Sequence, residues 1–303
     1  MNSVVFRGLT TETANYKNGF DTCLKTIRKW HDGEIIVSTW DDDPLLFDKK
    51  MIDTLVLSKD PGWTGKVFGW EDSEEMRNWP EQGGANHVNT IRQLTLAVAG
   101  AKAATGKKTL LTRTDFRHGK NLFDIHDEED SSKIIIPCVG TIWPDFKNIQ
   151  RRFLRKRPYP IMIKFSKRLQ SCPFHFSDLF QCGLTENIKN WASDAVMGNV
   201  VANIWTCRAI EQLWSCSYLN LFRDYDFDFK DLEKDKNKHW SVLMKNFTVL
   251  GTWESRSISI KDEYRKRHRR RPNSKFYIWP KHIANYKEKI EQKLKPTELK
   301  EDQ

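Results

Sequence analysis

Val4-Val5-Phe6-Arg7-Gly8 opens the chain as a short apolar run, and Glu34-Ile35-Ile36-Val37-Ser38-Thr39-Trp40-Asp41-Asp42-Asp43 follows as a longer, β-branched one. Between them, apolar residues recur at spacings of three and four over residues 20 to 30, the pattern of an amphipathic helix that ends before Gly33. This order predicts a strand, a helix and a parallel strand. Because open α/β sheets bind ligands at the carboxyl ends of their strands, the acids after the second strand lie where a ligand is expected.

The next elements extend the same pattern. We expect a third strand over residues 54 to 57 and a helix over residues 89 to 105, which Gly106 closes. A further strand over residues 109 to 112 then leads into Arg113-Thr114-Asp115. Alternating strands and helices of this kind predict an α/β fold in which several strands end at one edge of a sheet.

The second half of the chain is less regular. Apolar runs over residues 134 to 136 and 161 to 165 predict strands, and two helices are expected over about residues 185 to 205 and 208 to 222. High charge without periodicity predicts a loop from residue 224 to residue 238. The lysine-rich end of the chain predicts a helix.

The composition describes a folded chain with a basic excess. Hydrophobic residues make up 39% and charged residues 30%, which excludes the low-hydrophobicity profile of disordered chains. No apolar run approaches the roughly 20 residues of a membrane span, and the N-terminus lacks the pattern of a secretion signal. The six cysteines are scattered without a Cys-x-x-Cys pair, so we expect reduced thiols in a cytoplasmic protein. The net charge of +10 favours a polyanionic partner.

Several enzyme classes are disfavoured because their motifs are missing. No Gly-x-Gly-x-x-Gly follows the first strand, and the sequence has neither a Walker loop nor a Gly-x-Ser-x-Gly elbow. Asp115, His118, His175 and Asp178 carry the side chains that zinc or non-haem iron bind. No His-x-His or His-Glu-x-x-His pattern supports such a site, so we do not expect one.

An order of parts, rather than a single motif, points to a known fold. The opening unit ends in an acidic loop, a helix carries Asn89-x-x-Arg92 near its start, and the next strand ends in Asp115. This order resembles the nucleotide-sugar-binding half of the GT-A glycosyltransferases. More closely, the chain resembles the WavE family associated with lipopolysaccharide synthesis. The matching stretches are Val4 to Gly8, Glu34 to Trp40, Asn89 to Gln93, Arg113 to Phe116, Phe176 to Asp178 with Gly183, and Ile210 to Gln212.

The resemblance implies a fold and a division of the chain. It implies an α/β fold with a GT-A-like mixed, mostly parallel sheet flanked by helices, Rossmann-like in its nucleotide-binding half. The catalytic domain would span residues 1–223, with the nucleotide-sugar half over about 1–118 and the acceptor half over about 119–223. Residues 224–303 would form a basic, helical C-terminal extension.

The resemblance also implies a function and several site residues. The chain would be a glycosyltransferase that moves a sugar from a nucleotide-sugar donor to lipopolysaccharide or another surface polysaccharide, such as capsule. In the GT-A fold the acids after the second strand hold base and ribose, which points to Asp41 and Asp43. The Asp-x-Asp metal motif of the fold reads Arg113-Thr114-Asp115 here. Asp115 would ligate a divalent cation, Mn²⁺ or Mg²⁺, and Arg113 could supply part of the charge that neutralises phosphate. Alternatively, Asp115 is a turn cap.

Two further roles complete the predicted site. Arg7 and Arg92 are candidates to bind the donor diphosphate, and Gly8 would let the nucleotide approach the backbone closely; each arginine could equally be solvated or paired with a surface acid. Transfer to a hydroxyl also needs a general base, for which Asp178 and Glu211 are the candidates. Glu211 lies on an otherwise apolar helix, where an acid is either part of the polar face or functional.

The C-terminal segment carries a block of basic residues, from Arg265 to Arg271, followed by Phe276, Tyr277 and Trp279. This segment could attach the chain to an anionic membrane leaflet, bind nucleic acid, or be a solvated tail. We favour the membrane surface over nucleic acid, because a transferase that acts on lipid-linked saccharides works there. The prediction is therefore a cytoplasmic enzyme, peripheral on the inner face of the cytoplasmic membrane.

Two alternative functions stay open at this point. A nucleotidyl- or phospho-polyol transferase could use the same diphosphate-binding crevice, since a fold does not fix a reaction. A non-catalytic protein that binds nucleic acid or another polyanion could use the basic C-terminal block instead.

Overall fold

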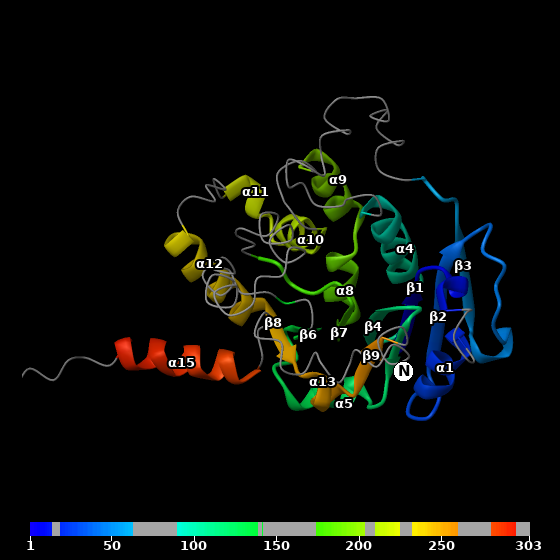
Figure 1. Cartoon of the computed structure of the whole chain (residues 1–303), viewed down its shortest axis with the longest axis horizontal. Helices are drawn as coiled ribbons and strands as arrows, with labels where there is room; N and C mark the ends of the chain where they lie inside the picture. Colours follow the sequence, from blue (N-terminus) through cyan, green and yellow to red (C-terminus); the bar gives the residue numbers. More distant parts are fainter. Residues whose placement is uncertain are drawn as a thin grey trace, which may run out of the picture.

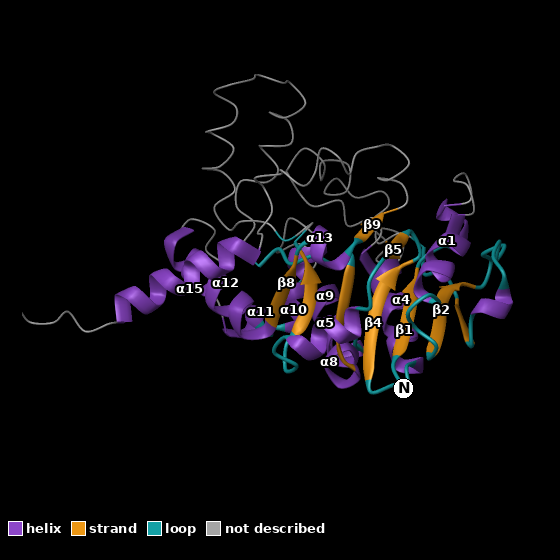
Figure 2. Cartoon of the chain, turned by 90° about the horizontal axis from the view of Figure 1, so that it is seen from below, coloured by secondary structure: helices purple, strands orange, loops and turns teal. Residues whose placement is uncertain are grey.

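A computed structural model describes residues 1–13, 19–62, 90–138, 141, 174–203, 210–224, 232–259 and 280–294. The strand predicted over residues 161 to 165, the basic block and the aromatic residues after it lie outside these described residues. The described part is a central sheet with helices on both faces, and Figure 2 shows its strands side by side.

The strands form one large and one small sheet. The strands of the large sheet are β1 (Ser3–Arg7), β2 (Glu34–Trp40), β3 (Thr54–Ser58), β4 (Lys108–Arg113), β6 (Ile134–Pro137), β7 (Phe180–Leu184) and β8 (Phe247–Leu250), in the order β3-β2-β1-β4-β7-β6-β8. Only β7 runs antiparallel to its neighbours in this described sheet. The small sheet pairs β5 (Phe116–His118) with β9 (Ser257–Ser259). The predicted mixed, mostly parallel sheet is confirmed.

Helices connect these strands and cover both faces of the sheet. They are α1 (Gly19–Ile27), α4 (Thr90–Ala103), α5 (Leu122–Glu128), α8 (Thr185–Trp191), α9 (Asp194–Ala202), α10 (Ile210–Tyr218), α11 (Leu221–Asp224), α12 (Leu232–Asn246), α13 (Thr252–Ser255) and α15 (Pro280–Leu294), with short 3₁₀ turns η1 (Thr10–Thr13) and η2 (Lys49–Met51). Figure 1 shows α4, α8, α9 and α10 on one side of the strands and α1 and α5 on the other.

Alternation along the strands builds two hydrophobic cores. Val5 packs in the core that α4 and α8 to α12 cover, whereas Val4 and Phe6 pack in the core that α1 and α5 cover. Successive strand residues point to opposite faces, so one apolar run can fill both cores. All three side chains are fully buried, which explains why the opening stretch is apolar throughout rather than alternating.

The parallel strands bring polar residues together at one edge of the large sheet. β1 ends at Arg7, β2 at Trp40 and β4 at Arg113. Arg7 is paired in register with Arg113 on one side and with Ser38 on the other. Two arginines therefore lie on neighbouring strands at the edge where α/β sheets bind ligands.

Two of the expected boundaries in the second half are wrong. The helix expected over residues 185 to 205 is two helices, because the Ser193 hydroxyl accepts a hydrogen bond from the Val196 backbone N–H and starts α9 as a new helix. The loop expected up to residue 238 ends earlier, because α12 begins at Leu232.

The strands β8 and β9, near the C-terminal end of the chain, contribute to both sheets. β8 pairs with β6 at the edge of the large sheet, and β9 pairs with β5. The predicted lysine-rich helix is present as α15, and Tyr286 stacks on Trp240 with ring centroids 4.7 Å apart. Among the described helices, none is long and apolar enough to cross a membrane.

Candidate active site

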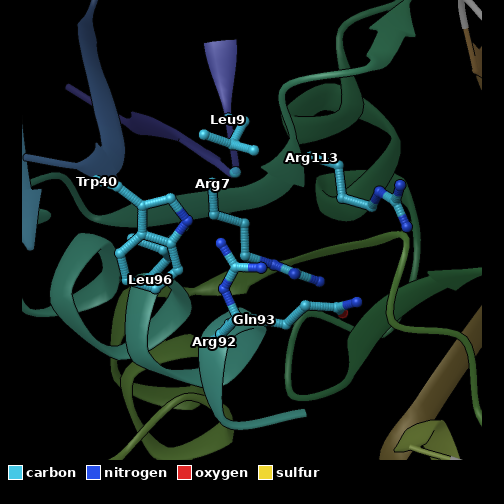
Figure 3. Close-up of a pocket in the computed structure, with 8 residues that line it drawn as sticks. Arg7, Leu9, Trp40, Arg92, Gln93, Leu96 and Arg113 are labelled. Atoms are coloured by element: carbon cyan, nitrogen blue, oxygen red, sulfur yellow. The ribbon is translucent and has the colours of Figure 1, made fainter. Parts of the chain in front are cut away.

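A pocket lies at the carboxyl edge of β1, β2 and β4. Its lining consists of Arg7, Gly8, Leu9, Trp40, Arg92, Gln93, Leu96 and Arg113. Figure 3 shows Arg92 and Gln93 reaching from α4 towards Arg7, with Trp40 beside them and Arg113 further off. The pocket measures about 140 Å³. Because pockets that enclose drug-sized ligands measure roughly 300 to 1,000 Å³, this one suits phosphate groups rather than a whole nucleotide sugar.

Arg7 is the most deeply buried cation of the pocket. Its side chain is 3% exposed, and its Nη2 donates to the Asp178 carbonyl oxygen at 2.5 Å and lies 3.6 Å from the Asp178 carboxylate. The guanidinium carbon also lies 5.2 Å from the centre of the Trp214 ring, a cation–π contact. Burial lowers the pKa of Arg7 and the Asp178 carboxylate opposes that effect. Within the described structure its buried Nε has no hydrogen-bond partner.

Gly8 shapes the backbone at the mouth of the pocket. Its φ of +121° is a conformation that residues with a side chain rarely adopt. A Cβ at this position would lie 3.0 Å from the Thr114 hydroxyl oxygen. The Gly8 N–H donates to the Ser38 carbonyl oxygen at 3.1 Å, and the Thr114 N–H donates to the Arg7 carbonyl oxygen at 3.1 Å. Gly8 thus allows the ends of β1, β2 and β4 to lie close together beside the pocket.

Arg92 is held by an acid and an aromatic ring. Its Nε donates to Asp60 Oδ1 at 2.9 Å and its Nη2 to Asp60 Oδ2 at 2.5 Å, a two-pronged pair. The guanidinium carbon lies 5.5 Å from the centre of the Trp40 ring. The side chain of Arg92 is 29% exposed, so it is fixed in place at the pocket and is still open to a ligand.

Asp115 binds protein partners through both carboxylate oxygens. Arg113 Nε donates to Oδ1 at 2.9 Å, Arg113 Nη2 lies 3.3 Å from Oδ2, and the Ser259 hydroxyl also lies 3.3 Å from Oδ2. The described residues contain no group of three His, Cys, Asp or Glu that could hold a metal ion. Among the described residues, Asp115 is thus a lone acid whose oxygens Arg113 and Ser259 bind, and this donor set does not fit a resident divalent cation.

The two acids after β2 have different surroundings. Asp43 is buried, and its carboxylate accepts hydrogen bonds from the Thr10 N–H at 2.7 Å, the Thr10 hydroxyl at 3.0 Å and the Thr39 hydroxyl at 2.5 Å. These bonds tie the loop after β2 to η1. Asp41 is exposed, and its backbone N–H donates to the Ser58 carbonyl oxygen. Of the two, Asp41 presents its carboxylate to solvent, and Asp43 organises the loop.

His118 lies inside the protein and joins β4 to β9. Its Nε2 is 2.8 Å from the Thr112 hydroxyl and its Nδ1 is 2.7 Å from the Ser257 hydroxyl. Burial lowers the pKa of His118 to about 3, so the ring is neutral at ordinary pH. The contacts of His118 are those of a structural histidine that links β4 to β9.

The candidate bases lie next to the arginine pocket. Asp178 precedes β7 and contacts Arg7, whereas Glu211 is the second residue of α10. His175 Nε2 lies 3.4 Å from Glu211 Oε2. The Asp178 carboxylate acts electrostatically on Glu211, so the two acids lie in one neighbourhood, although each has a different partner.

The family of the chain follows from comparison with known proteins. The family described as WavE lipopolysaccharide synthesis matches residues 3–292. The chain belongs to this family. No curated protein matches the chain.

Three solved structures are similar to this WavE-family chain over most of its length. Mouse xyloside xylosyltransferase 1 is 10% identical, covers 82% of this chain and 84% of its own, and has a TM-score of 0.34. The galactosyltransferase LgtC, in complex with donor and acceptor sugar analogs, is 10% identical. The match covers 82% of this chain and 73% of LgtC, with a TM-score of 0.35. HddC from Yersinia pseudotuberculosis is 11% identical, and the match covers 89% of this chain and 99% of HddC, with a TM-score of 0.37. These likenesses are too distant to assign an activity.

Sequence reasoning missed several residues of the candidate site. Trp40 and Gln93 line the pocket, Asp60 holds Arg92, and Trp214 contacts Arg7. Trp214 lies one turn after Glu211, so the i, i+3 spacing on α10 was a signal that both could face the same neighbour. The pairing of Arg92 with Asp60 had no such signal, because the two residues lie on different elements.

Proposed function

We propose that this chain is a glycosyltransferase of lipopolysaccharide synthesis, which moves a sugar from a nucleotide-sugar donor to a saccharide acceptor. The observation that carries the proposal is the pocket with three arginines at the carboxyl edge of the sheet, in a chain of the WavE family. Guanidinium groups bind phosphate oxygens through paired N–H groups, and a diphosphate presents several such oxygens.

The arginines would act where negative charge develops. As the bond between the sugar C1 and the phosphate oxygen breaks, the leaving diphosphate takes the electron pair. Arg7, Arg92 and Arg113 would stabilise that charge, because donors fixed in advance need no reorganisation during the reaction. Asp41 is the acid that we propose to contact the ribose or base of the donor. Arg113 and Ser259 already bind the Asp115 carboxylate, so we propose a reaction in which no step runs through a divalent cation.

We also propose that the acceptor is lipid-linked and that the chain works at the anionic inner face of the cytoplasmic membrane. Exposed Lys281 and Lys287 lie on α15, which follows the basic block in the sequence. Each Lys or Arg near an anionic surface contributes about 1 kcal/mol of attraction. In vesicle sedimentation, binding should need anionic lipid and should weaken when residues 265 to 271 are neutralised; equal binding to neutral vesicles would contradict this location.

A thermal-shift panel tests the proposed activity. The chain is mixed with UDP-, GDP-, CMP- and ADP-sugars, each with Mn²⁺, with Mg²⁺ or with EDTA. A donor that binds only the folded state raises the melting temperature by mass action. We expect one nucleotide family to do so, and Arg7→Met to abolish the shift. No shift from any donor would contradict the proposal.

Product analysis with the stabilising donor separates the two transferase reactions. A glycosyltransferase releases the nucleoside diphosphate and transfers the sugar alone, whereas a nucleotidyl- or phospho-polyol transferase also transfers phosphate. Binding to nucleic acid without any donor binding would favour the non-catalytic alternative, and that binding should weaken steeply with salt.

A further inference from the structure

Asp178 and Glu211 differ in what holds each carboxylate. Asp178 is 5% exposed in its side chain, and Arg7 contacts both its backbone carbonyl oxygen and its carboxylate. Arg7 thus occupies the polar atoms of Asp178, and with 5% of its side chain exposed the Asp178 carboxylate offers little room for a substrate hydroxyl. Asp178 is therefore suited to hold Arg7 in the pocket and poorly suited to accept a proton from a substrate.

Glu211 has the opposite surroundings. Its side chain is 27% exposed, and its partner is His175, whose Nε2 lies 3.4 Å from Glu211 Oε2. The next residue on the same face of α10 is Trp214, whose ring contacts the Arg7 guanidinium. The face of α10 that carries Glu211 is thus turned to the arginine pocket. Glu211 is an accessible carboxylate beside the place where we propose the donor diphosphate to bind.

We propose that Glu211 is the catalytic base that removes the proton of the acceptor hydroxyl, that His175 positions it, and that Asp178 instead positions Arg7. This inference rests on the proposed glycosyltransferase function. The acceptor oxygen forms a bond to the sugar C1 as the C1–O bond to the diphosphate breaks. The proton of the acceptor moves to the Glu211 carboxylate, and the electron pair leaves with the nucleoside diphosphate. A single displacement of this kind inverts the configuration at C1.

The charges around Glu211 agree with this role. Although 27% of its side chain is exposed, protein surrounds most of the Glu211 carboxylate, and this desolvation is the main cause that raises its pKa above the ordinary value. The Asp178 carboxylate adds to the rise. His175 and the Arg113 guanidinium oppose the rise. A carboxylate with a raised pKa accepts a proton more readily. Activity should therefore fall as the pH falls through the pKa of Glu211, at a pH above that of an ordinary glutamate.

The first test compares two glutamates at matched positions. Glu211 and Glu186 are each the second residue of a helix, α10 and α8, and Glu186 is exposed outside the pocket. The probe is the panel nucleotide sugar that stabilises the wild-type chain, and the rate is the release of nucleoside diphosphate. Glu211→Gln should lower kcat about 100-fold or more while donor binding is kept, since a general base contributes about 10²- to 10⁴-fold. Glu186→Gln should keep the wild-type rate.

A second test asks whether the lost function is proton removal. Azide is a nucleophile that carries no proton to remove, so azide should restore release of nucleoside diphosphate in Glu211→Gln and give a glycosyl azide of inverted configuration. Failure of azide to restore the rate, or a product of retained configuration, would overturn the assignment. Full turnover by Glu211→Gln with intact donor binding would also overturn it. If the wild-type chain binds no nucleotide sugar of the panel, that result would instead contradict the proposed function itself.

The role of His175 has its own readout. His175→Gln removes an interaction that lowers the pKa of Glu211, so the acid side of the pH–rate profile should move to higher pH. The rate at high pH should return to near the wild-type value, because Glu211 is still present. An unchanged profile would contradict a positioning role. Loss of activity at every pH, with a fully active Glu211→Gln, would make His175 the base instead.

Discussion

The two sides of the candidate active site use the same residue types in opposite ways. On the pocket side, each arginine is held by an acid: Arg7 contacts Asp178, and Arg113 contacts Asp115. On the side of α10, Glu211 faces a histidine and is partly open to solvent. An acid near this site is therefore a support for a cation where it meets a guanidinium, and a candidate for chemistry where it does not.

The arginines of the pocket and the acid of α10 also differ in whether their charge has to change during the reaction. The cations of the pocket are fixed before any ligand arrives, because burial and their acid partners restrict them. A fixed guanidinium binds phosphate at a lower entropic cost than a mobile side chain. The acid of α10 has to change its protonation state, so it needs exposure and a weaker partner.

The largest effect is expected from Arg7→Met, which keeps a similar length and removes the charge. Asp178 would then be a buried carboxylate without its partner, and breaking one half of a buried ion pair costs about 3–5 kcal/mol of stability. Denaturant unfolding should show that loss, and the thermal-shift panel should show no donor binding. A variant with wild-type stability would contradict the view that Arg7 and Asp178 depend on each other.

The double variant Arg7→Met/Asp178→Asn sharpens that result. Removing both charges leaves no unpaired ion, so a large part of the lost stability should return. Donor binding should stay absent, because no guanidinium is restored. Recovery of donor binding together with stability would mean that Arg7 supports the fold only and contacts no ligand.

A smaller effect is expected from Arg113→Gln. Arg113 is 26% exposed and lies at the rim, so the change should weaken donor binding without abolishing it. A hydrogen bond to a charged group contributes about 1.5–3 kcal/mol, which corresponds to a Kd raised roughly 10- to 100-fold. Lys102→Gln on the outer side of α4 is the matched control, since its side chain is 60% exposed and lies outside the pocket. Equal binding by the two variants would remove Arg113 from the donor site.

Gly8→Ala tests the backbone of the pocket rather than its charge. The positive φ of Gly8 and the close Thr114 hydroxyl should make the change cost about 1–3 kcal/mol of stability. Gly198→Ala is the control: its Cβ would meet nothing within 4 Å, and alanine in a helix should stabilise the chain by about 0.5–1 kcal/mol. Unfolding in urea measures both. A neutral Gly8→Ala would show that the strand ends can separate without cost.

The sequence predicted the strands that build the pocket better than the contacts within it. The opening strand-helix-strand unit follows from apolar periodicity, and parallel strands necessarily bring Arg7 and Arg113 to one edge. Periodicity cannot show which side chains pair across elements, so the bond of Asp43 to Thr10 was not foreseen. Short elements such as β5 and β9 carry too few residues for a periodic signal, and they bring Ser259 to Asp115.

The smallest effect is expected from removing divalent cations. Three guanidinium groups already supply positive charge to the pocket, and Arg113 with Ser259 binds both oxygens of Asp115. Mg²⁺ bound through one carboxylate depends on phosphates and water for its other ligands, and here that carboxylate would have to leave Arg113. The donor-induced shift in melting temperature should therefore be the same in EDTA as in Mn²⁺ or Mg²⁺. A shift that disappears in EDTA, and that is also absent in Asp115→Asn, would instead assign Asp115 as a ligand of the cation. The arginines would then add to the positive charge of a bound metal ion rather than take its place.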